Sequence, residues 1–290
     1  MKTYLLIHRI RIQNANAMSS PYTIGFPAMT AWLGAVHALQ RSVQQNGLER
    51  VSMLKTAVSC HTFHLHTYRG KGDAFQSIIG TANPLNKDGE RPSFIEEARC
   101  HLEISLLIEV AGVDGDNKNE VIDFVQSQLH RMKMAGGDIL SFRHIELLFV
   151  DANDLTQVRA CLRKLMPGYV LVERRDLMTA AMNNENDALG AVLDSTKVSY
   201  VGKADETGNV QWRAEKAPGW IVPIAVGFHG ISELGKVPNQ RDETQEHRFA
   251  ESVVTLGEFK MPYRFQSLDE MMWSYSTDLD QDLYVCKNQQ

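Results

Sequence analysis

The order of strand and helix patterns over the first 150 residues constrains the fold most strongly. Residues 3–13 alternate with a period of two, which predicts a strand. One predicted face carries Tyr4, Leu6, His8, Ile10 and Ile12, and the other carries Leu5, Ile7, Arg9, Arg11 and Gln13. Pro27 suits a first helical turn, and the apolar spacing after it predicts a helix that ends near Gly47.

Further patterns complete this order. Strands are predicted over residues 51–68, 94–110 and 139–150, and an apolar stripe from Val121 to Met132 predicts a second helix that stops at Gly136-Gly137. The order β-α-β-β-α-β is the ferredoxin-like arrangement, which RNA-recognition modules also use. We therefore predict an α+β protein whose residues 1–150 form a ferredoxin-like, RRM-like RNA-binding domain.

The pattern beyond Asp151 is less regular. It predicts a helix over residues 154–166, a short strand in the run YVLVE, helical pieces to about residue 195 and a terminal helix from Leu268 to Tyr275. We predict that residues 151–290 form an irregular α+β region that binds partners.

The segment 70–93 joins two predicted strands and is too long for a tight hairpin. Connections longer than about a dozen residues tend to be functional or mobile. Its polar residues suit a projecting basic finger, and the alternative is a disordered surface loop. These residues are Arg69, Lys71, Asn83, Asn86, Lys87 and Arg91.

The distribution of charge separates the two parts of the chain. A net charge of −5 argues by itself against nucleic acid. However, residues 1–175 hold 20 Lys and Arg against 17 Asp and Glu, whereas residues 176–290 hold 10 against 18. The first acidic residue is Glu49. A local positive field can bind phosphate while the remainder faces a protein partner.

Several classes of protein are excluded by what the sequence lacks. No apolar run approaches the roughly 18 residues of a membrane helix, and the N-terminus has no signal-peptide pattern, so we expect no membrane partner. The cysteines are far apart, which favours buried thiols in a reducing cytoplasm over disulfides or zinc. They are Cys60, Cys100, Cys161 and Cys286. Motifs of serine hydrolases, P-loops and Rossmann folds are missing, and we predict no cofactor.

A polar loop without carboxylates leads from the first strand into the first helix. Its candidate RNA ligands are Gln13, Asn14, Asn16, Ser19 and Ser20. Backbone N–H groups at a helix start attract phosphate, and short amide and hydroxyl side chains bond to phosphate, ribose and base edges. Arg9 and Arg11 would hold the RNA backbone electrostatically. The alternative is an ordinary loop whose side chains cap the helix and satisfy turns.

Histidines and aromatic residues offer weaker signals. His64 and His66 share a strand face without His61, and no cysteine or carboxylate completes a ligand set, so we predict no metal site. His37, four residues before Arg41, could act as general base in RNA cleavage, but no second proton carrier is identifiable and we predict no catalytic residue. Aromatic residues suited to base stacking, or more simply to a core or interface, are Trp212, Trp220, Tyr263, Trp273 and Tyr275.

The run IQNANAMSSPYTIGFPAMTAWLGAVHALQRSV, residues 12–43, closely resembles the start of the second Csy subunit of type I-F CRISPR surveillance complexes, the Cas-five counterpart. Further similar stretches occur in the same order along almost the whole chain, and the weakest lies at about 175–210. They are NPLNKDGERPSFIEEARCHLEISLL, KMAGGDIL, PGYVLVER, APGWIVPIAVGF and RFAESVVTLGEF.

The resemblance implies a non-catalytic RNA-binding subunit of the RAMP type, which holds the 5′ handle of the CRISPR RNA (crRNA). It implies pairing with the large subunit, contact with the first backbone subunit and only indirect contact with target DNA. The resemblance also implies that cleavage of the precursor RNA belongs to a different subunit. The alternative to an RNA-binding subunit is a metal-independent endoribonuclease that uses His37. The positions matched as RNA-binding are Gln13, Asn14, Asn16, Ser19, Ser20, Arg41, Asn83, Asn86 and Arg99.

Overall fold

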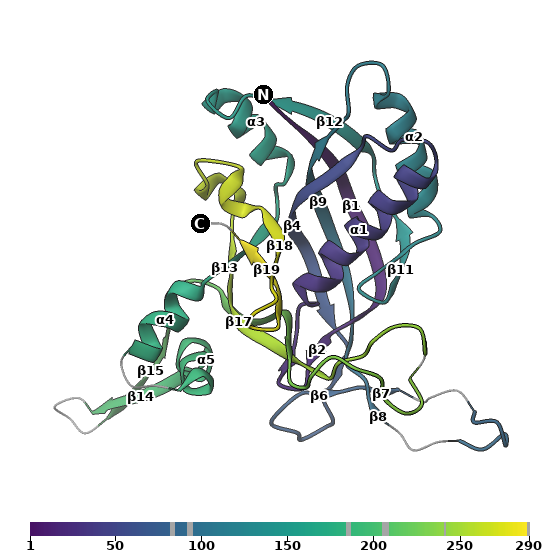
Figure 1. Ribbon diagram of the computed structural model, residues 1–290. Coiled ribbons are helices and arrows are strands. Elements are labelled where there is room, and N and C mark those ends of the chain that lie inside the picture. The colour runs from purple at the N-terminus through teal and green to yellow at the C-terminus, as the bar shows by residue number, and fades with distance from the viewer. Residues whose placement is uncertain (82–84, 92–94, 184–186, 205–208, 241, 289–290) are drawn as a thin grey trace.

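The computed structural model describes residues 1–81, 85–91, 95–183, 187–204, 209–240 and 242–288 (Figure 1). It is an α+β structure, as the sequence predicts, built in this part of the chain on one antiparallel sheet of eleven strands. In sheet order the strands are β10 (Lys133–Met134), β11 (Gly137–Ser141), β1 (Lys2–Asn16), β9 (Arg99–Ala111), β4 (Ser52–Leu65), β13 (Tyr169–Glu173), β17 (Ala250–Lys260), β16 (Ile221–Gly230), β19 (Leu283–Asn288) and β18 (Trp273–Asp278), with β12 (Ile145–Val150) also beside β1.

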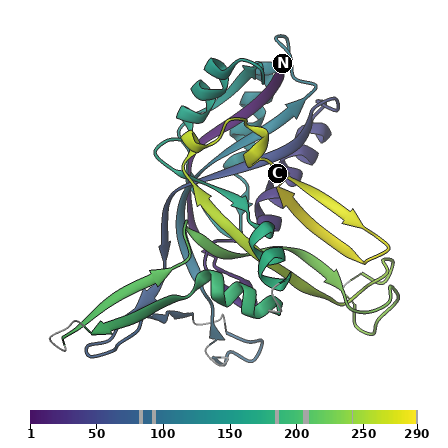
Figure 2. The ribbon, with the colours of Figure 1, turned by 90° about the vertical axis from the view of Figure 1, so that its left-hand side faces the viewer.

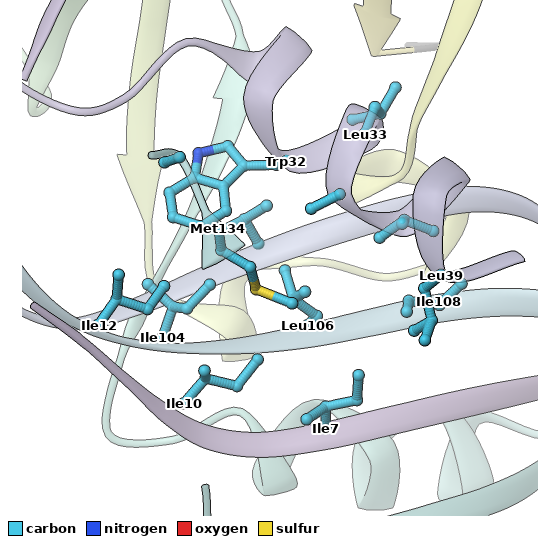
Figure 3. Close-up of a cluster of buried hydrophobic side chains, with 14 of the residues drawn as sticks. Ile7, Ile10, Ile12, Trp32, Leu33, Leu39, Ile104, Leu106, Ile108 and Met134 are labelled. Carbon is cyan, nitrogen blue, oxygen red and sulfur yellow. The ribbon is translucent and has the colours of Figure 1, made fainter. Parts of the chain in front are cut away.

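Helices α1 (Met29–Gln45) and α2 (Lys118–Leu129) cover one face of this sheet. The apolar stripe of α1 packs on β1 and β9, and Trp32 of α1 lies among side chains from several elements, including Ile12, Ile104 and Met134 (Figure 3). All four of these side chains are at most 2% exposed. The predicted apolar spacing therefore does form the core-facing side of the first helix.

Two bulges in β1 change which residues face this core. The register with β9 shifts between Ile7 and Ile10 and again between Ile12 and Ala15. Arg9 and Asn14 have positive φ values of 51° and 57° at these shifts. An extra residue in a strand shifts the alternation by one position, so the residues after the bulge change faces. The predicted faces were therefore wrong beyond His8.

The corrected assignment is simple. Side chains that face α1 and α2 are Leu5, Ile7, Ile10, Ile12 and Ala15. Tyr4 and Leu6 face the opposite side, and Arg9 and Arg11 follow them there. The bulge at Arg9 thus places two adjacent residues, His8 and Arg9, on the side away from the helices.

Two other boundaries differ from the prediction. The second helix ends at Leu129, and Gly136, with φ 74°, makes the turn between β10 and β11. The predicted strand 139–150 is divided at residues 142–144, because β11 pairs with the end of β1 and β12 pairs with its beginning. Arg143 therefore lies in the loop between β11 and β12, where its backbone N–H donates to the carbonyl of His8 in the middle of β1.

The sheet continues into the second half of the chain. β13 pairs with β4 and with β17, and Trp273 of β18 pairs with Thr56 of β4, so that six strands close on themselves. The predicted terminal helix was wrong. Only a 3-10 turn at Asp269–Met271 is helical, and Trp273–Asp278 is a strand because it pairs along its length with β19.

Helix α3 (Leu155–Lys164) covers part of the face opposite α1 and α2 (Figure 2). Asp154 caps it by accepting hydrogen bonds from the N–H groups of Thr156 and Gln157. The helix packs on Tyr4 and Leu6 near the start of β1. It does not cover the end of β1, where this face of the sheet is open.

Shorter elements extend from the sheet. Strands β2 (Met18–Ser20) and β3 (Thr23–Ile24) form the loop before α1, and the segment after β4 contains the pairs β5 (Thr67–Tyr68) with β6 (Ser77–Ile78) and β7 (Gly80–Thr81) with β8 (Ile95–Glu96). Helices α4 (Arg175–Asn183) and α5 (Ala188–Thr196) precede a hairpin of β14 (Val198–Ala204) and β15 (Val210–Lys216). This hairpin projects from the body of the molecule (Figures 1 and 2).

The four cysteines are free and buried, as predicted. Burial raises the pKa of the Cys60 thiol to about 12, so it is protonated and unreactive at neutral pH. Among the described helices, not one has the length and apolar character that crossing a membrane requires.

Candidate nucleic-acid interface

A groove of about 650 Å³ runs over the open face of the sheet, beyond the end of α3. We call it the sheet groove. It is formed where β1, β4 and β9 lie side by side and where the loop after β11 reaches over β1. Its lining residues are Arg9, Arg11, Ile12, Gln13, Thr62, His64, His101, Leu102, Glu103, Leu140, Ser141, Phe142 and Arg143.

The positive charges in the sheet groove are not equally available. The guanidinium of Arg9 donates to Glu103 at 2.8 Å, so that charge is largely neutralised. Arg11 and Arg143 are exposed and make no ion pair with any described residue. The groove therefore presents two uncompensated cations, one of which, Arg143, the sequence analysis missed.

His61 of β4 is connected to the bulge of β1 through Ser105 of β9. Its Nδ1 lies 2.6 Å from the carbonyl of Pro167, which can only accept, so Nδ1 carries the proton. Nε2 is then left to accept from the Ser105 hydroxyl at 2.8 Å. Ser105 in turn accepts the backbone N–H of Arg9 at 3.1 Å, so a neutral His61 holds the bulge of β1 in place.

This geometry makes stability depend on pH. Burial lowers the pKa of His61, and nearby Arg9 and Arg143 lower it further, against the opposing effect of the Pro167 carbonyl. The unfolded chain therefore binds the proton more readily, and the free energy of unfolding falls as the pH drops through about 6.5. We expect urea titrations at pH 7.5 and 5.5 to show this fall, and a smaller one in His61→Gln. An equal fall in the variant would contradict the assignment.

A second groove, of about 780 Å³, lies on the opposite side, over the outer face of α1. We call it the helix groove. Asn16 and Ser19 from the opening loop meet Arg41 and His37 of α1 there, beside Lys133, whose ammonium pairs with Asp138 at 2.8 Å. Its lining residues are Asn16, Ser19, Pro27, Ala28, Thr30, Ala31, Gly34, Ala35, His37, Ala38, Arg41, Lys133, Ala135, Gly136, Phe228, Tyr275 and Tyr284.

Small side chains along α1 allow a ligand to approach the helix backbone closely. Arg41 is exposed and has no ion-pair partner in the described ranges. The described lining contains no carboxylate and no second histidine. The helix groove is therefore suited to binding an anion, and His37 has no imidazole or carboxylate beside it for proton transfer.

Three predicted RNA-binding residues that lie between the two grooves are bonded to other residues of the protein. The N–H of Asn14 donates to Nδ1 of His101, and its carbonyl accepts from Arg99 at 3.2 Å. Arg99 also forms an ion pair with Glu97. Ser20 is buried and its hydroxyl is bonded to Thr23 at 2.8 Å, so this geometry does not offer it to a ligand.

The segment 70–93 provides fewer candidate RNA contacts than the two grooves. Oδ1 of Asn86 accepts the N–H groups of Asp88 and Glu90 and thereby forms a turn. The residue as a whole is exposed. Asn83 lies outside the described residues.

A third cavity, of about 290 Å³, has five aromatic residues among the twelve that line it. We call it the aromatic pocket. It lies where β4 and β13 diverge, and Thr62 lines both this pocket and the sheet groove. Of the predicted stacking residues, Trp220 lies here and Trp273 is fully buried in the core. The aromatic lining residues are Phe26, Phe63, Tyr169, Trp220 and Phe259.

The histidines considered for a metal do not converge. Within the described ranges, the one group that brings three ligand atoms together is His8, His144 and Glu146. Lys164 lies 3.0 Å from both carboxylate oxygens of Glu146, and the imidazole of His8 is 2.6 Å away. Burial opposes ionisation of Glu146, but hydrogen bonds from His8 and Lys164 outweigh it and lower the pKa. This group is therefore an ion-pair network in which a lysine already occupies the carboxylate.

Three residues of the sheet groove, Arg143, His101 and Glu103, carried a signal in the sequence. Residues 142–144, Phe-Arg-His, interrupt an otherwise apolar strand pattern, which is where the strand divides and Arg143 is exposed. His101 and Glu103 alternate with buried residues in β9, so they occupy the open face. Their proximity to Arg11 depends on pairing between β1 and β9, which the sequence alone did not give.

The fold and the grooves define an antiparallel α+β protein that presents unpaired cations on two surfaces. The family model described as CRISPR-associated protein (Cas_Csy2) matches residues 5–286. The CRISPR-associated protein Csy2 of Pseudomonas aeruginosa (strain UCBPP-PA14) is 34% identical over 308 residues, covering 97% of this chain and 93% of that protein. The chain belongs to the Csy2 family of CRISPR-associated proteins, which confirms the resemblance found in its motifs.

Proposed function

We propose that this chain is a non-catalytic RNA-binding subunit of a type I-F CRISPR (Csy) surveillance complex and that it holds the 5′ handle of the crRNA. The single observation that carries this proposal is the sheet groove, where Arg11 and Arg143 stand uncompensated on an open strand face. Membership of the Csy2 family supports the same conclusion. The bound complex acts in antiviral DNA targeting, with target DNA contacted only indirectly.

The arrangement of the first 150 residues supports a ferredoxin-like RNA-binding domain of the RAMP type. The principal strands lie in the order β12, β1, β9, β4, with both crossover helices on one face. RNA-recognition modules with this strand order bind single strands on the face that the helices leave open. The sheet groove lies on that face.

We propose three contributions to binding. Arg11 and Arg143 neutralise phosphates in the sheet groove, Asn16, Ser19 and Arg41 contact backbone or bases in the helix groove, and the aromatic pocket stacks an unpaired base. A short single strand needs only such a local positive surface, so the net charge of −5 is compatible with RNA binding.

The remaining surface, with the acidic second part of the chain, is proposed to contact the large subunit and the first backbone subunit in the cytoplasm. An adaptor without RNA contacts is the competing interpretation. Crosslinking of the assembled particle with 4-thiouridine in the handle distinguishes them. We expect adducts on peptides that contain residues 9–20 and 141–143, whereas their absence would favour the adaptor.

The alternative function, a metal-independent endoribonuclease with His37 as general base, has a direct test. The pure protein is incubated with repeat RNA and EDTA. We expect the RNA to remain intact, because the helix groove provides His37 with no imidazole or carboxylate partner in its described lining. Site-specific cleavage that His37→Ala abolishes would establish the enzyme instead.

A further inference from the structure

The hairpin of β14 and β15 has one apolar face that no other part of the described chain covers. The register pairs Tyr200 with Ala214 and Gly202 with Trp212, and alternate residues of a strand point to opposite faces. The other face carries charged and polar residues, such as Lys203 and Gln211, and one apolar residue, Val201. The apolar face comprises Val198, Tyr200, Gly202, Ala204, Val210, Trp212 and Ala214.

The large side chains of this face are strongly exposed. Tyr200 and Trp212 are each 70% exposed, and Val198 and Val210 are 51% and 53% exposed. A two-stranded hairpin alone is marginally stable in water, and exposed apolar patches on soluble proteins usually mark interaction surfaces. The helix that leads into the hairpin also exposes Leu189.

Trp212 has a fixed place on the hairpin. A methyl group added at Gly202 would come within 3.3 Å of the indole ring, so the ring lies over the glycine. The ring is thereby oriented before any partner binds, which reduces the entropy lost on association. Rigid, amphipathic tryptophan and tyrosine side chains are the residues most often found at the energetic centre of protein interfaces.

Charge decides between a protein and a nucleic acid as the occupant. The apolar face carries no charge except Lys216 at its base, whereas single-stranded nucleic acid requires cations along the stacking surface. Lys203 and Arg213 lie on the opposite face and point away from the apolar one. The apolar face therefore fits a partner protein with an apolar surface and a carboxylate opposite Lys216.

We propose that the apolar face of the β14–β15 hairpin docks onto another protein subunit of the complex, with Trp212 and Tyr200 as its central contacts. This deepens the partner-binding part of the proposed function and rests on that part alone. A stable interface needs about 800 Å² from each partner, so the hairpin is one element of a larger contact surface.

The test places the photo-crosslinking residue p-benzoylphenylalanine at position 212 in the complex co-expressed with its other subunits and crRNA. Position 211, on the opposite face, is the matched control. We expect irradiation to join position 212 to another protein subunit with about tenfold higher yield than position 211. An adduct with RNA, an adduct with a second copy of this chain, or equal yields at the two positions would overturn the proposal.

A pair of variants keeps this result separate from RNA binding. Tyr200→Ser with Trp212→Ser should reduce co-purification of the partner subunit about tenfold, whereas Ser199→Ala with Gln211→Ala should not. Affinity of the isolated chain for handle RNA should be unchanged in both variants. Loss of RNA binding together with partner binding would overturn the docking assignment, and failure of the wild-type chain to bind RNA would overturn only the proposed RNA function.

Discussion

Replacing Arg11 and Arg143 together with alanine should weaken binding of a crRNA handle about 10- to 100-fold and flatten its salt dependence. These two guanidinium groups are the uncompensated cations of the sheet groove. Each phosphate contact with single-stranded nucleic acid contributes about 0.7 to the slope of log K against log salt, so the slope should fall by about 1.4. Filter binding at several salt concentrations measures both quantities.

The matched control removes the same charge elsewhere. Arg50 and Lys118 are exposed, and neither lines the sheet groove or the helix groove. Arg50→Ala with Lys118→Ala should leave the salt slope within about 0.3 of the wild type, since more distant charges are screened. If both double variants lowered the slope equally, RNA would be bound by the general field of the protein and not by the sheet groove.

Arg9→Ala is expected to act differently from Arg11→Ala. The guanidinium of Arg9 is 2.8 Å from Glu103, and its removal leaves that carboxylate unpaired in the groove. The unpaired carboxylate of Glu103 would then repel phosphate, whereas Arg11→Ala removes only a cation. A combined Arg9→Ala and Arg11→Ala variant therefore reports on Glu103 as well, which makes Arg143 the better partner for Arg11.

Replacing Trp273 with alanine should lower the free energy of unfolding by about 3–5 kcal/mol, the usual cost of truncating a buried tryptophan. Trp273 is fully buried, and its Nε1–H donates to the carbonyl of Leu171 at 2.8 Å. It also pairs with Thr56 where β18 meets β4, so the indole holds together the closure of the second half of the sheet. Urea unfolding followed by circular dichroism measures the change.

Trp212→Ala provides the comparison for this prediction. Trp212 is 70% exposed and belongs to the projecting hairpin, so its truncation should change the free energy of unfolding by only about 0.5 kcal/mol. Similar losses for the two variants would show that the core does not depend on the Trp273 closure.

Trp273→Phe separates packing from hydrogen bonding at the same position. It retains most of the apolar volume but removes the donor to Leu171, which should cost about 1–2 kcal/mol.

The elements with long apolar periodicity were predictable because local pattern decides them. The helix after Pro27 and the strands over residues 51–68 and 94–110 were found close to their observed positions. In contrast, residues 268–275 have a pattern compatible with a helix, yet residues 273–275 are extended because β18 pairs with β19. Tertiary pairing overrode local preference there, as it commonly does for short segments.

The candidate site was predictable in part. The sequence identified Arg9, Arg11 and Gln13 on one strand and Asn16, Ser19 and Arg41 near the first helix, but it grouped them as one surface. The structure separates them into two grooves on opposite sides of the sheet. In the structure the hydroxyl of Ser20 is bonded to Thr23 within a turn, which the residue type alone does not reveal.

The sequence by itself determined the α+β class, the core-facing stripe of α1, the four buried thiols and the family, because these follow from residue type, spacing and extended similarity. Only the tertiary structure decided which charges are available. The bulge at Arg9 depends on the register between β1 and β9, and the pairing of Arg9 with Glu103 depends on that register. Arg143 reaches the same groove because two strands share β1 as a neighbour, a relation that no local pattern encodes.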